Sequence, residues 1–298
     1  MNKVTKEKHV KAILENSELS VTVDSFGAEM HSILKDGAEY LWQADKKYWG
    51  RHAPVLFPIV GKLKNGEYHY NDTTYKMGGH GFARDNEFKL ISADNKKLVF
   101  ELRENEDTLS QYPFHFEFRV IYQLNDNKIK VRYEVKNEDE KFMSFGVGAH
   151  PAFNVPIHNG SFEDYKLTIS PAEKRTFIPL DPPSGTIKID KKMDKVVDEL
   201  PLTRELFDQD ALVFTSSKET KVSLTNQLDS HSVSVSWKNM PYFGLWSPYP
   251  ADAPFVCIEP WCGIADDVNT DGDITTKFGI NELAPEGEFS CEYEIEIN

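Results

Sequence analysis

The sequence predicts an all-β fold, with one large, mostly antiparallel β domain over residues 1–298. Three observations support this prediction. Ten segments alternate apolar with polar residues or are rich in β-branched side chains, as strands are. Turn residues lie between these segments, and no linker rich in Pro, Gly or Ser divides the chain. No long amphipathic helices separate the segments, which excludes repeated βαβ units.

The clearest alternation is KIKVRYEVK at residues 128–136, where Ile129, Val131, Tyr133 and Val135 share one face and charged residues share the other. This period of two predicts a strand with one buried face. The expected strands are residues 19–23, 98–102, 116–124, 129–135, 165–169, 212–214, 221–224, 233–237, 255–259 and 289–297.

Turns are predicted from residues that tolerate positive φ angles. Asn65-Gly66 permits a tight turn, so we expect a hairpin between residues 62–64 and 67–70. Residues 125–127, Asn-Asp-Asn, join the two longest alternating segments in the same way.

Helical signals are weak and local. Residues 104–111 are typical of a short helix, which Pro113 ends. Residues 6–16 show some helical spacing with scattered charges. Residues 171–202, rich in Pro, Lys and Asp, are interpreted as a long excursion within the sheet rather than a domain boundary.

Composition and charge narrow the function classes. Lys and Arg number 34 and Asp and Glu 48, and the net charge of −14 repels phosphate backbones and anionic lipids. We therefore expect neither a nucleic acid nor a membrane as partner. The N-terminus has charges and no apolar signal segment, and the three cysteines lack C-x-x-C spacing. Reduced thiols in a cytoplasmic protein fit this pattern. No sequence motif indicates an oligomeric state.

Four stretches place polar residues in apolar or Gly/Pro-rich surroundings and do not fit the strand pattern. They are GRHAP (50–54), GGHGFAR (78–84), GVGAHPAFN (146–154) and FVCIEPWCG (255–263). Glu259 follows an apolar strand, where an unpaired carboxylate is costly to bury. Taken alone, such a glutamate is more often paired with arginine or capped by backbone amides than used as a general base.

The same comparison applies to three basic residues. His150 follows small residues and precedes Pro151. It is either a core histidine with satisfied ring nitrogens, the more frequent case, or a proton donor near neutral pH. His80 lies among glycines, where a backbone can approach a ligand, or is an ordinary loop histidine. Arg51, beside Trp49, is a ligand contact or a surface arginine stacked on aromatic rings.

Several catalytic and metal-binding motifs are absent from the sequence. No glycine-rich nucleotide loop follows a strand, and there is no G-x-S-x-G nucleophile elbow. Residues 267–272 begin like a calcium loop, but Phe278 stands where the bidentate acid belongs. No two histidines have the spacing H-x-x-x-H or H-E-x-x-H of a zinc site. We therefore expect no metal and no cofactor.

Four motifs in this order, GRHAPVLFPIVG, HGFAR, GAHPAFN and CIEPWCG, resemble those of the aldose 1-epimerase (galactose mutarotase-like) family, and in particular its LacX-type branch. The resemblance covers nearly the whole chain from Phe26. It implies a large antiparallel β-sandwich, the galactose mutarotase-like supersandwich, in agreement with the strand pattern. It also implies an isomerase that acts on a hexose.

The resemblance implies roles for particular residues. Carried over by motif, His150 of GAHPAFN is the general acid and Glu259 of CIEPW is the general base. Arg51 and His80 match substrate-binding positions. Asp210, in a shorter motif, resembles an aspartate that holds sugar hydroxyls. The aromatic residues that could contact the apolar face of a sugar, although core packing is their more frequent role, are Trp49, Phe82, Phe153 and Trp261.

These residue types suit the interconversion of sugar anomers. An ionised Glu259 takes the proton of the C1 hydroxyl while a protonated His150 donates to the ring oxygen, the ring opens, and reclosure on the other carbonyl face reverses the roles. We expect the two charges to stabilise each other. Ala149 stands where several family members have Asn, so the hydrogen-bond partner of His150 is left open.

Two alternatives to a mutarotase remain at this point. A hexose-6-phosphate 1-epimerase would use Arg84, with Arg51 and Lys62, to hold a phosphate, because guanidinium groups match phosphate geometry. A non-catalytic carbohydrate-binding protein would keep the fold without the chemistry. The presence of both His150 and Glu259 argues against the second alternative.

Overall fold

A single extended antiparallel sheet makes up most of the protein. The computed structural model describes residues 9–298. The strands of the large sheet are β5 (Val55–Leu56), β8 (Lys89–Ala93), β9 (Lys97–Arg103), β10 (Phe116–Asn125), β11 (Lys128–Asn137), β13 (Val147–Ala149), β14 (Ala152–Asn154), β15 (Tyr165–Ile178), β18 (Met193–Pro201), β19 (Leu212–Thr215), β20 (Glu219–Asn226), β21 (Val233–Lys238), β22 (Tyr242–Trp246), β23 (Phe255–Cys262) and β25 (Glu288–Ile297). Their order is β5-β13-β23-β22-β19-β15-β20-β21-β25-β11-β10-β9-β8, with β14 beside β23 and β18 beside β15.

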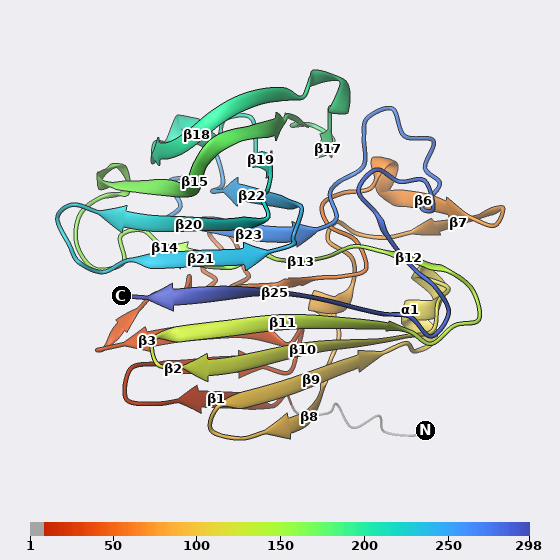
Figure 1. The fold of residues 1–298 in the computed structure, drawn as a ribbon, viewed down its shortest axis with the longest axis horizontal. Coiled ribbons are helices and arrows are strands. Elements are labelled where there is room, and N and C mark those ends of the chain that lie inside the picture. Colours follow the sequence, from red (N-terminus) through yellow and green to blue (C-terminus); the bar gives the residue numbers. More distant parts are fainter. Residues whose placement is uncertain (1–8) are drawn as a thin grey trace.

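Smaller sheets and short helices complete the chain (Figure 1). A four-stranded sheet contains β1 (Lys11–Glu15), β2 (Ser20–Asp24), β3 (Glu29–Lys35) and β4 (Ala38–Glu39). Three pairs stand apart: β6 (Glu67–Tyr70) with β7 (Thr73–Lys76), β12 (Met143–Phe145) with β24 (Asn281–Leu283), and β16 (Leu180–Asp181) with β17 (Thr186–Ile187). The helix α1 spans Glu106–Gln111, and the 3-10 turns are Lys64–Gly66, Ala83–Asp85, Phe162–Asp164, Ile189–Lys191 and Arg204–Phe207.

The large sheet folds back on itself to form two layers. Beyond β15 the strand order continues through β19, β22 and β23, which overlap β20 and β21 in the view of Figure 1. Trp237 on β21 packs on Phe243 of β22, with ring centroids 5.3 Å apart, although these strands are not neighbours in the sheet. At the other end of the sheet, the Tyr122 hydroxyl donates to the Ala28 carbonyl beside the four-stranded sheet at 2.7 Å. The expected large antiparallel β-sandwich is confirmed.

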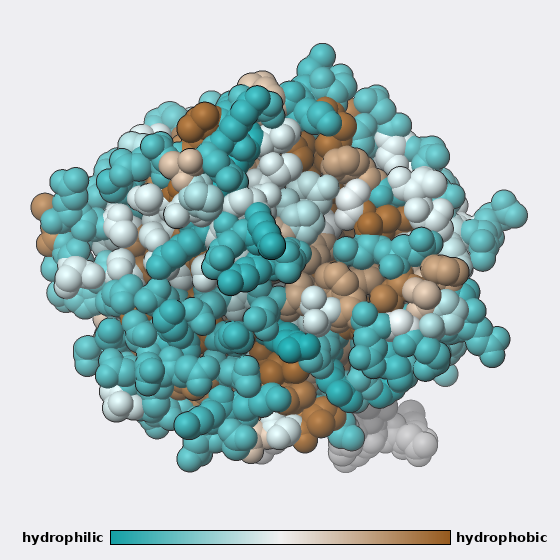
Figure 2. Space-filling view, viewed as in Figure 1, coloured by the Kyte–Doolittle hydropathy of each residue, from teal (hydrophilic) through white to brown (hydrophobic). Residues whose placement is uncertain are grey.

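All ten segments expected as strands are strands in the structure. The β10–β11 register pairs Asn125 with Lys128, so the two residues between them form the expected turn. The four apolar residues that alternate along β11 are buried. The opposite face carries ion pairs such as Lys128–Glu294 at 2.9 Å, and Figure 2 shows this side of the protein as mostly hydrophilic.

The prediction of a hairpin at Asn65-Gly66 was wrong. Both residues have positive φ angles, 59° and 70°, but the segment closes a 3-10 turn instead of a hairpin. The hairpin forms one turn later, between β6 and β7, because Asn71 and Asp72 also adopt positive φ angles. The residues before Asn65 are held elsewhere, since the Lys64 N–H donates to the Asp266 carboxylate at 2.8 Å.

The two expected helical segments differ in outcome. The helix α1 is confirmed, and Asn105 caps it by accepting a hydrogen bond from the Thr108 N–H at 2.9 Å. The weak helical spacing of residues 6–16 was misleading, because residues 11–15 form β1 with alternating burial, and residues 6–8 lie outside the described part. None of the helices described in residues 9–298 has the length and apolar character needed to cross a membrane.

Candidate active site

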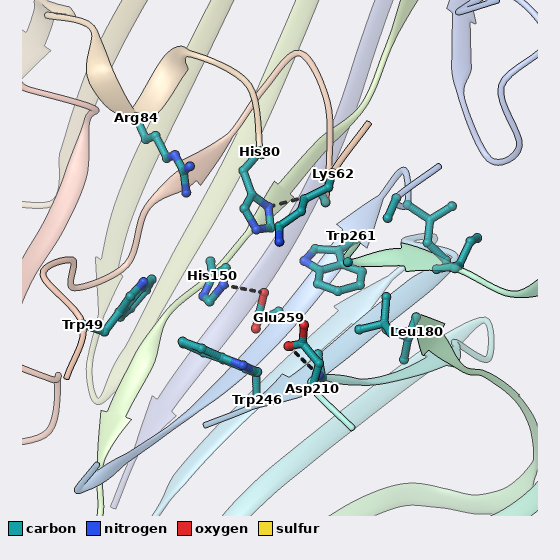
Figure 3. Close-up of a pocket in the computed structure, with 17 residues that line it drawn as sticks. Trp49, Lys62, His80, Arg84, His150, Leu180, Asp210, Trp246, Glu259 and Trp261 are labelled. Carbon is teal, nitrogen blue, oxygen red and sulfur yellow. Dashed lines mark hydrogen bonds and ion pairs between the residues drawn. The ribbon is translucent and has the colours of Figure 1, made fainter. Parts of the chain in front are cut away.

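A cavity of about 260 Å³ lies over the β13–β23 part of the large sheet (Figure 3). Its walls come from segments that are far apart in the sequence, including the loop before β5, the β13–β14 junction, the β16–β17 hairpin, β22 and β23. The lining residues are Trp49, Gly61, Lys62, His80, Arg84, His150, Leu180, Gly185, Ile187, Asp210, Ala211, Val213, Trp246, Glu259, Trp261, Ile264 and Ala265.

His150 and Glu259 face each other in this cavity. His150 lies in the junction between β13 and β14, both of which pair with the continuous strand β23 that carries Glu259. This arrangement places the imidazole beside the carboxyl group, with Nε2 of His150 3.1 Å from Oε2 of Glu259. We call these two residues the central pair.

Burial dominates the protonation of the central pair. The two side chains are only 8% and 2% exposed. Burial raises the pKa of Glu259 well above its ordinary value, and the nearby Asp210 carboxylate raises it further. Burial also lowers the pKa of His150 to about 3, and the charge of Arg84 adds to this shift. Both pKa shifts favour the uncharged forms, a neutral carboxyl group and a neutral imidazole, whereas the sequence analysis expected two charges that stabilise each other.

Aromatic side chains fix the imidazole of His150 on several sides. Trp49 stacks on it with ring centroids 4.9 Å apart, and Trp246 meets it edge-on at 5.8 Å. His80 approaches from a third direction, with a centroid distance of 5.3 Å. The ring is thus held in one orientation, while its far edge is directed at Glu259 (Figure 3).

His80 is held as a neutral hydrogen-bond donor. It has a φ of 66°, and its ring nitrogen Nδ1 accepts a hydrogen bond from the Gly61 N–H at 3.2 Å. Burial, followed by the influence of His150, lowers the pKa of His80 well below its ordinary value. Since Nδ1 is the acceptor, the proton is on Nε2, which leaves an N–H group available to a ligand oxygen.

Unpaired polar atoms concentrate in the cavity. Among the described residues, five buried side-chain atoms lack a hydrogen-bond partner, and three belong to cavity residues: Nε of Arg84, Nδ1 of His150 and Nε1 of Trp261. A buried polar group without a partner costs about 1–3 kcal/mol, so such groups are rare unless a ligand satisfies them. This arrangement is suited to a small molecule rich in oxygen atoms.

Comparison with known proteins identifies the family. The family model described as aldose 1-epimerase matches residues 11–284. The chain belongs to the aldose 1-epimerase family. The chromosomal protein LacX of Lactococcus lactis subsp. lactis is 33% identical over 294 residues, which cover 95% of this chain and 98% of that protein.

Solved structures of family relatives have the same fold. A galactose mutarotase related enzyme from Lactobacillus acidophilus is 38% identical and superimposes with a TM-score of 0.95 over 97% of both chains. A galactose mutarotase-like protein from Lactobacillus casei is 32% identical, with a TM-score of 0.90 over 97% of this chain and all of that chain. The resemblance of the four motifs to the aldose 1-epimerase family is confirmed.

Two residues expected to bind substrate in this aldose 1-epimerase family member lie outside the cavity lining. Arg51 instead pairs with Asp85 at 2.8 Å and donates to the Arg84 carbonyl at 3.4 Å, so it supports the loop that carries Arg84. Phe153 has no exposed surface and packs in the main apolar core. The charge of Arg51 and the ring of Phe153 thus have protein partners, although the charge of Arg51 still acts on His80 and His150, and their contact with a sugar stays a prediction.

Most of the other expected site residues line the cavity. His80, Arg84, Asp210, Trp49 and Trp261 join the central pair there, whereas Phe82 is 5% exposed and packs in the main apolar core. Asp210 has a φ of 74°, and its carboxylate accepts a hydrogen bond from the Ala211 N–H at 2.9 Å, which orients it at the cavity wall (Figure 3).

Other walls of the cavity were not predicted from the sequence. Trp246, at the end of β22, had no motif to mark it. Leu180, Gly185 and Ile187 belong to the β16–β17 hairpin, within the segment interpreted only as an excursion. No local pattern indicates that a surface hairpin folds over a particular site, so the tertiary structure alone shows this contact.

Glycines on the neighbouring strands make room for Trp261. Gly148 on β13 is opposite Trp261 in the register, and a Cβ atom there would lie 2.7 Å from Cδ1 of the indole. A Cβ atom at Gly244 on β22 would overlap the six-membered ring. The glycines therefore allow the large indole to lie flat across the sheet beside Glu259.

Substitution of Gly244→Ala should displace Trp261. Because both the backbone and the ring are rigid, we expect the free energy of unfolding to fall by about 1–3 kcal/mol. Chemical denaturation followed by tryptophan fluorescence measures this change. Gly78→Ala is the matched control, since no atom lies within 4 Å of a Cβ there, and its effect should stay within about 0.5 kcal/mol. Equal effects of the two substitutions would contradict the packing argument.

Proposed function

We propose that the protein is an aldose 1-epimerase that interconverts the α and β anomers of a hexose. The observation that supports this most strongly is the central pair, an imidazole and a carboxyl group 3.1 Å apart in a cavity with unpaired polar groups. Family membership agrees with this function. The hydroxyl oxygen and the ring oxygen of a pyranose are both bonded to C1, so the base and the acid must lie side by side to reach them.

The mechanism starts with one proton held by the central pair between two uncharged groups, the state that both pKa shifts favour. Transfer of this proton from Glu259 to His150 produces a carboxylate and an imidazolium without any change in total charge. The carboxylate takes the proton of the C1 hydroxyl, and the imidazolium donates to the ring oxygen, which breaks the bond between C1 and that oxygen. Rotation about C1–C2 in the open aldehyde exposes the other carbonyl face, and the reverse transfers close the ring. The N–H groups of His80, Trp261 and Arg84 bind sugar oxygens during these steps.

Anomer exchange on fresh α-D-glucose and α-D-galactose tests the proposal. Polarimetry or NMR saturation exchange should show equilibration much faster than in protein-free buffer. Binding of the sugar with no acceleration would instead indicate a non-catalytic carbohydrate-binding protein and contradict the proposal.

The shifted pKa values predict the pH dependence of activity. Because burial lowers the pKa of His150 to about 3, a second proton enters the pair well below the ordinary imidazole value of 6.5. Between pH 7 and about pH 5 we therefore expect no acid limb in kcat/KM from His150. It should fall at high pH, where the raised pKa of Glu259 is exceeded and the shared proton is lost. An acid limb with an apparent pKa near 6.5 would show that His150 titrates as a solvated imidazole.

A second candidate substrate is a hexose 6-phosphate. Lys62 and Arg84 line the same cavity, and within residues 9–298 no carboxylate forms an ion pair with Lys62. An unpaired ammonium group and a guanidinium group that line one cavity can together hold a phosphate. This observation favours the phosphorylated sugar as an alternative substrate for the same central pair.

Lys62→Met separates the two substrate classes. If the phosphate binds here, the ratio of kcat/KM for glucose 6-phosphate to that for glucose should fall about tenfold, which corresponds to ~1.4 kcal/mol of lost interaction. Methionine keeps the apolar length of the side chain and removes its charge. The ratio is measured by NMR saturation exchange on both sugars, and an unchanged ratio would exclude Lys62 as a phosphate ligand.

A further inference from the structure

Two histidines outside the cavity have ring nitrogens without protein partners. The protein has nine histidines, all within residues 9–298. Seven have a ring nitrogen within hydrogen-bond distance of another protein atom. The exceptions are His31 and His52, whose rings stack with centroids 4.1 Å apart. Four unpaired imidazole nitrogens are therefore concentrated in one place.

Two carboxylates lie beside these rings. Oε2 of Glu29 is 3.9 Å from Nε2 of His31, and Oε1 of Glu29 is 3.9 Å from Nδ1 of His52. Oδ2 of Asp24 is 3.9 Å from the other nitrogen of His31, Nδ1. These separations are too long for direct hydrogen bonds, so the nitrogens remain available.

The spacing of the donor atoms suits a metal ion. One ligand atom from each of Glu29, His31 and His52 lies within 4.8 Å of the others. Around a tetrahedral zinc ion with bonds of about 2.0–2.1 Å, ligand atoms lie roughly 3.3 Å apart. The three ligand atoms lie within 4.8 Å of one another, so their separations need to shorten by at most about 1.5 Å.

The local structure holds Glu29 and leaves access for an ion. Oε1 of Glu29 accepts hydrogen bonds from the N–H groups of His52 and Ala53, at 2.7 and 2.9 Å. Glu29 and His31 stand two residues apart on β3, where the β2–β3 register shifts and leaves His31 without a partner on β2, and their side chains approach to 3.9 Å. The His31 and His52 side chains are 22% and 18% exposed, so solvent reaches the cluster.

We propose that Glu29, His31 and His52 form a binding site for a divalent transition-metal ion such as zinc. Two imidazole nitrogens and a carboxylate are donors typical of such ions, whereas Mg²⁺ and Ca²⁺ prefer oxygen ligands alone. Asp24, on the far side of His31, is placed to orient its ring, as carboxylates do beside metal-bound histidines. Because an imidazole lone pair lies in the plane of its ring, one ring turns out of the stack on binding, and water fills the remaining position.

A bound ion would join β3 to the loop that positions Trp49. His52 lies three residues after Trp49, and its carbonyl accepts a hydrogen bond from the Ala152 N–H at 3.0 Å, next to β14. Trp49 stacks on His150. The ion therefore stabilises the loop that supports the central pair, without touching the cavity.

Two other clusters of metal-capable side chains suit an ion less well. One consists of the central pair with Cys257 and belongs to the candidate active site. In the other, Asp229 already bonds to His158 at 3.2 Å and to His231, so an ion would first have to break these contacts. Substitutions in these two clusters therefore serve as control variants for the metal-binding experiment.

Isothermal titration calorimetry of the untagged full chain with Zn²⁺ tests the proposal. We expect one saturable site per chain in the unmodified protein, with an affinity at least about tenfold weaker in His31→Gln. His231→Gln, in the alternative cluster, should bind as the unmodified protein does. If His31→Gln fails to fold, as judged by circular dichroism, His52→Gln replaces it. Co²⁺ provides a second readout, because coordination in the unmodified protein should produce a visible d–d absorption that the cluster variant lacks.

Three results would overturn the proposal. The first is the absence of saturable Zn²⁺ binding to the folded chain. The second is binding that persists in both His31→Gln and His52→Gln. The third is a site that is lost in His231→Gln or Glu259→Gln instead, which would place the ion in one of the other clusters.

Discussion

Glu259→Gln should abolish anomer exchange while the fold persists. A positioned proton transfer contributes roughly 10²–10⁴-fold to a rate, and the amide of glutamine cannot accept the proton of the C1 hydroxyl. We therefore expect kcat/KM to fall by at least about 10²-fold, measured by NMR saturation exchange. The fold should persist because the raised pKa of Glu259 favours its neutral form, and an amide N–H can take the place of its 3.1 Å contact with Nε2 of His150.

Glu134→Gln provides the matched control for this prediction. Glu134 lies on β11 of the same large sheet, outside the cavity, where it pairs with Arg132 at 3.0 Å. This exposed ion pair is worth about 0–1 kcal/mol, so the control should keep its activity and its stability. Near-normal exchange rates in Glu259→Gln would refute the assignment of the base.

His150→Asn should impair exchange to a similar degree. Asparagine cannot become a cationic acid, so protonation of the ring oxygen is lost and the rate should fall by about 10²–10⁴-fold. The substitution also removes a ring that stacks on Trp49, so a lower melting temperature is expected as well. His150→Gln, which fills more of the space, separates the two effects: it should recover stability but not activity.

The double variant of the central pair distinguishes a shared role from two independent ones. Residues that act as a unit are not additive, so the Glu259→Gln, His150→Asn double variant should be little worse than either single variant. If the loss of activity in the double variant equals the product of the two single losses, the two side chains act in separate steps. Unchanged activity in His150→Asn alone would remove this residue as the acid.

Local sequence patterns predicted much of the sheet. Strands such as β11 follow from an alternation that depends only on which side chains avoid water. The prediction of a hairpin at Asn65-Gly66 was wrong because positive φ angles permit a turn but do not decide which flanking segments pair. Pairing depends on the long-range register, and Asn71-Asp72 offered an equally suitable turn nearby.

The motifs predicted part of the candidate site for a similar reason. Polar residues within apolar, glycine-rich stretches indicated His80, His150 and Glu259, since such residues need a special explanation. The motifs could not show that Arg51 pairs with Asp85, because this partner comes from a separate segment of the chain. No motif in the sequence indicated that His31 and His52 lie side by side.

The sequence by itself determined that this chain builds antiparallel strands and that an acid–base pair of side chains is available, because hydrophobic periodicity and residue chemistry are local properties. Only the tertiary structure decided which groups meet and in which protonation state. The pairing of β13 and β14 with β23 brings His150 to Glu259, and burial of both favours the uncharged form of each. Distances between remote segments and the dielectric around a charge are products of the whole packed fold, so no stretch of sequence contains them.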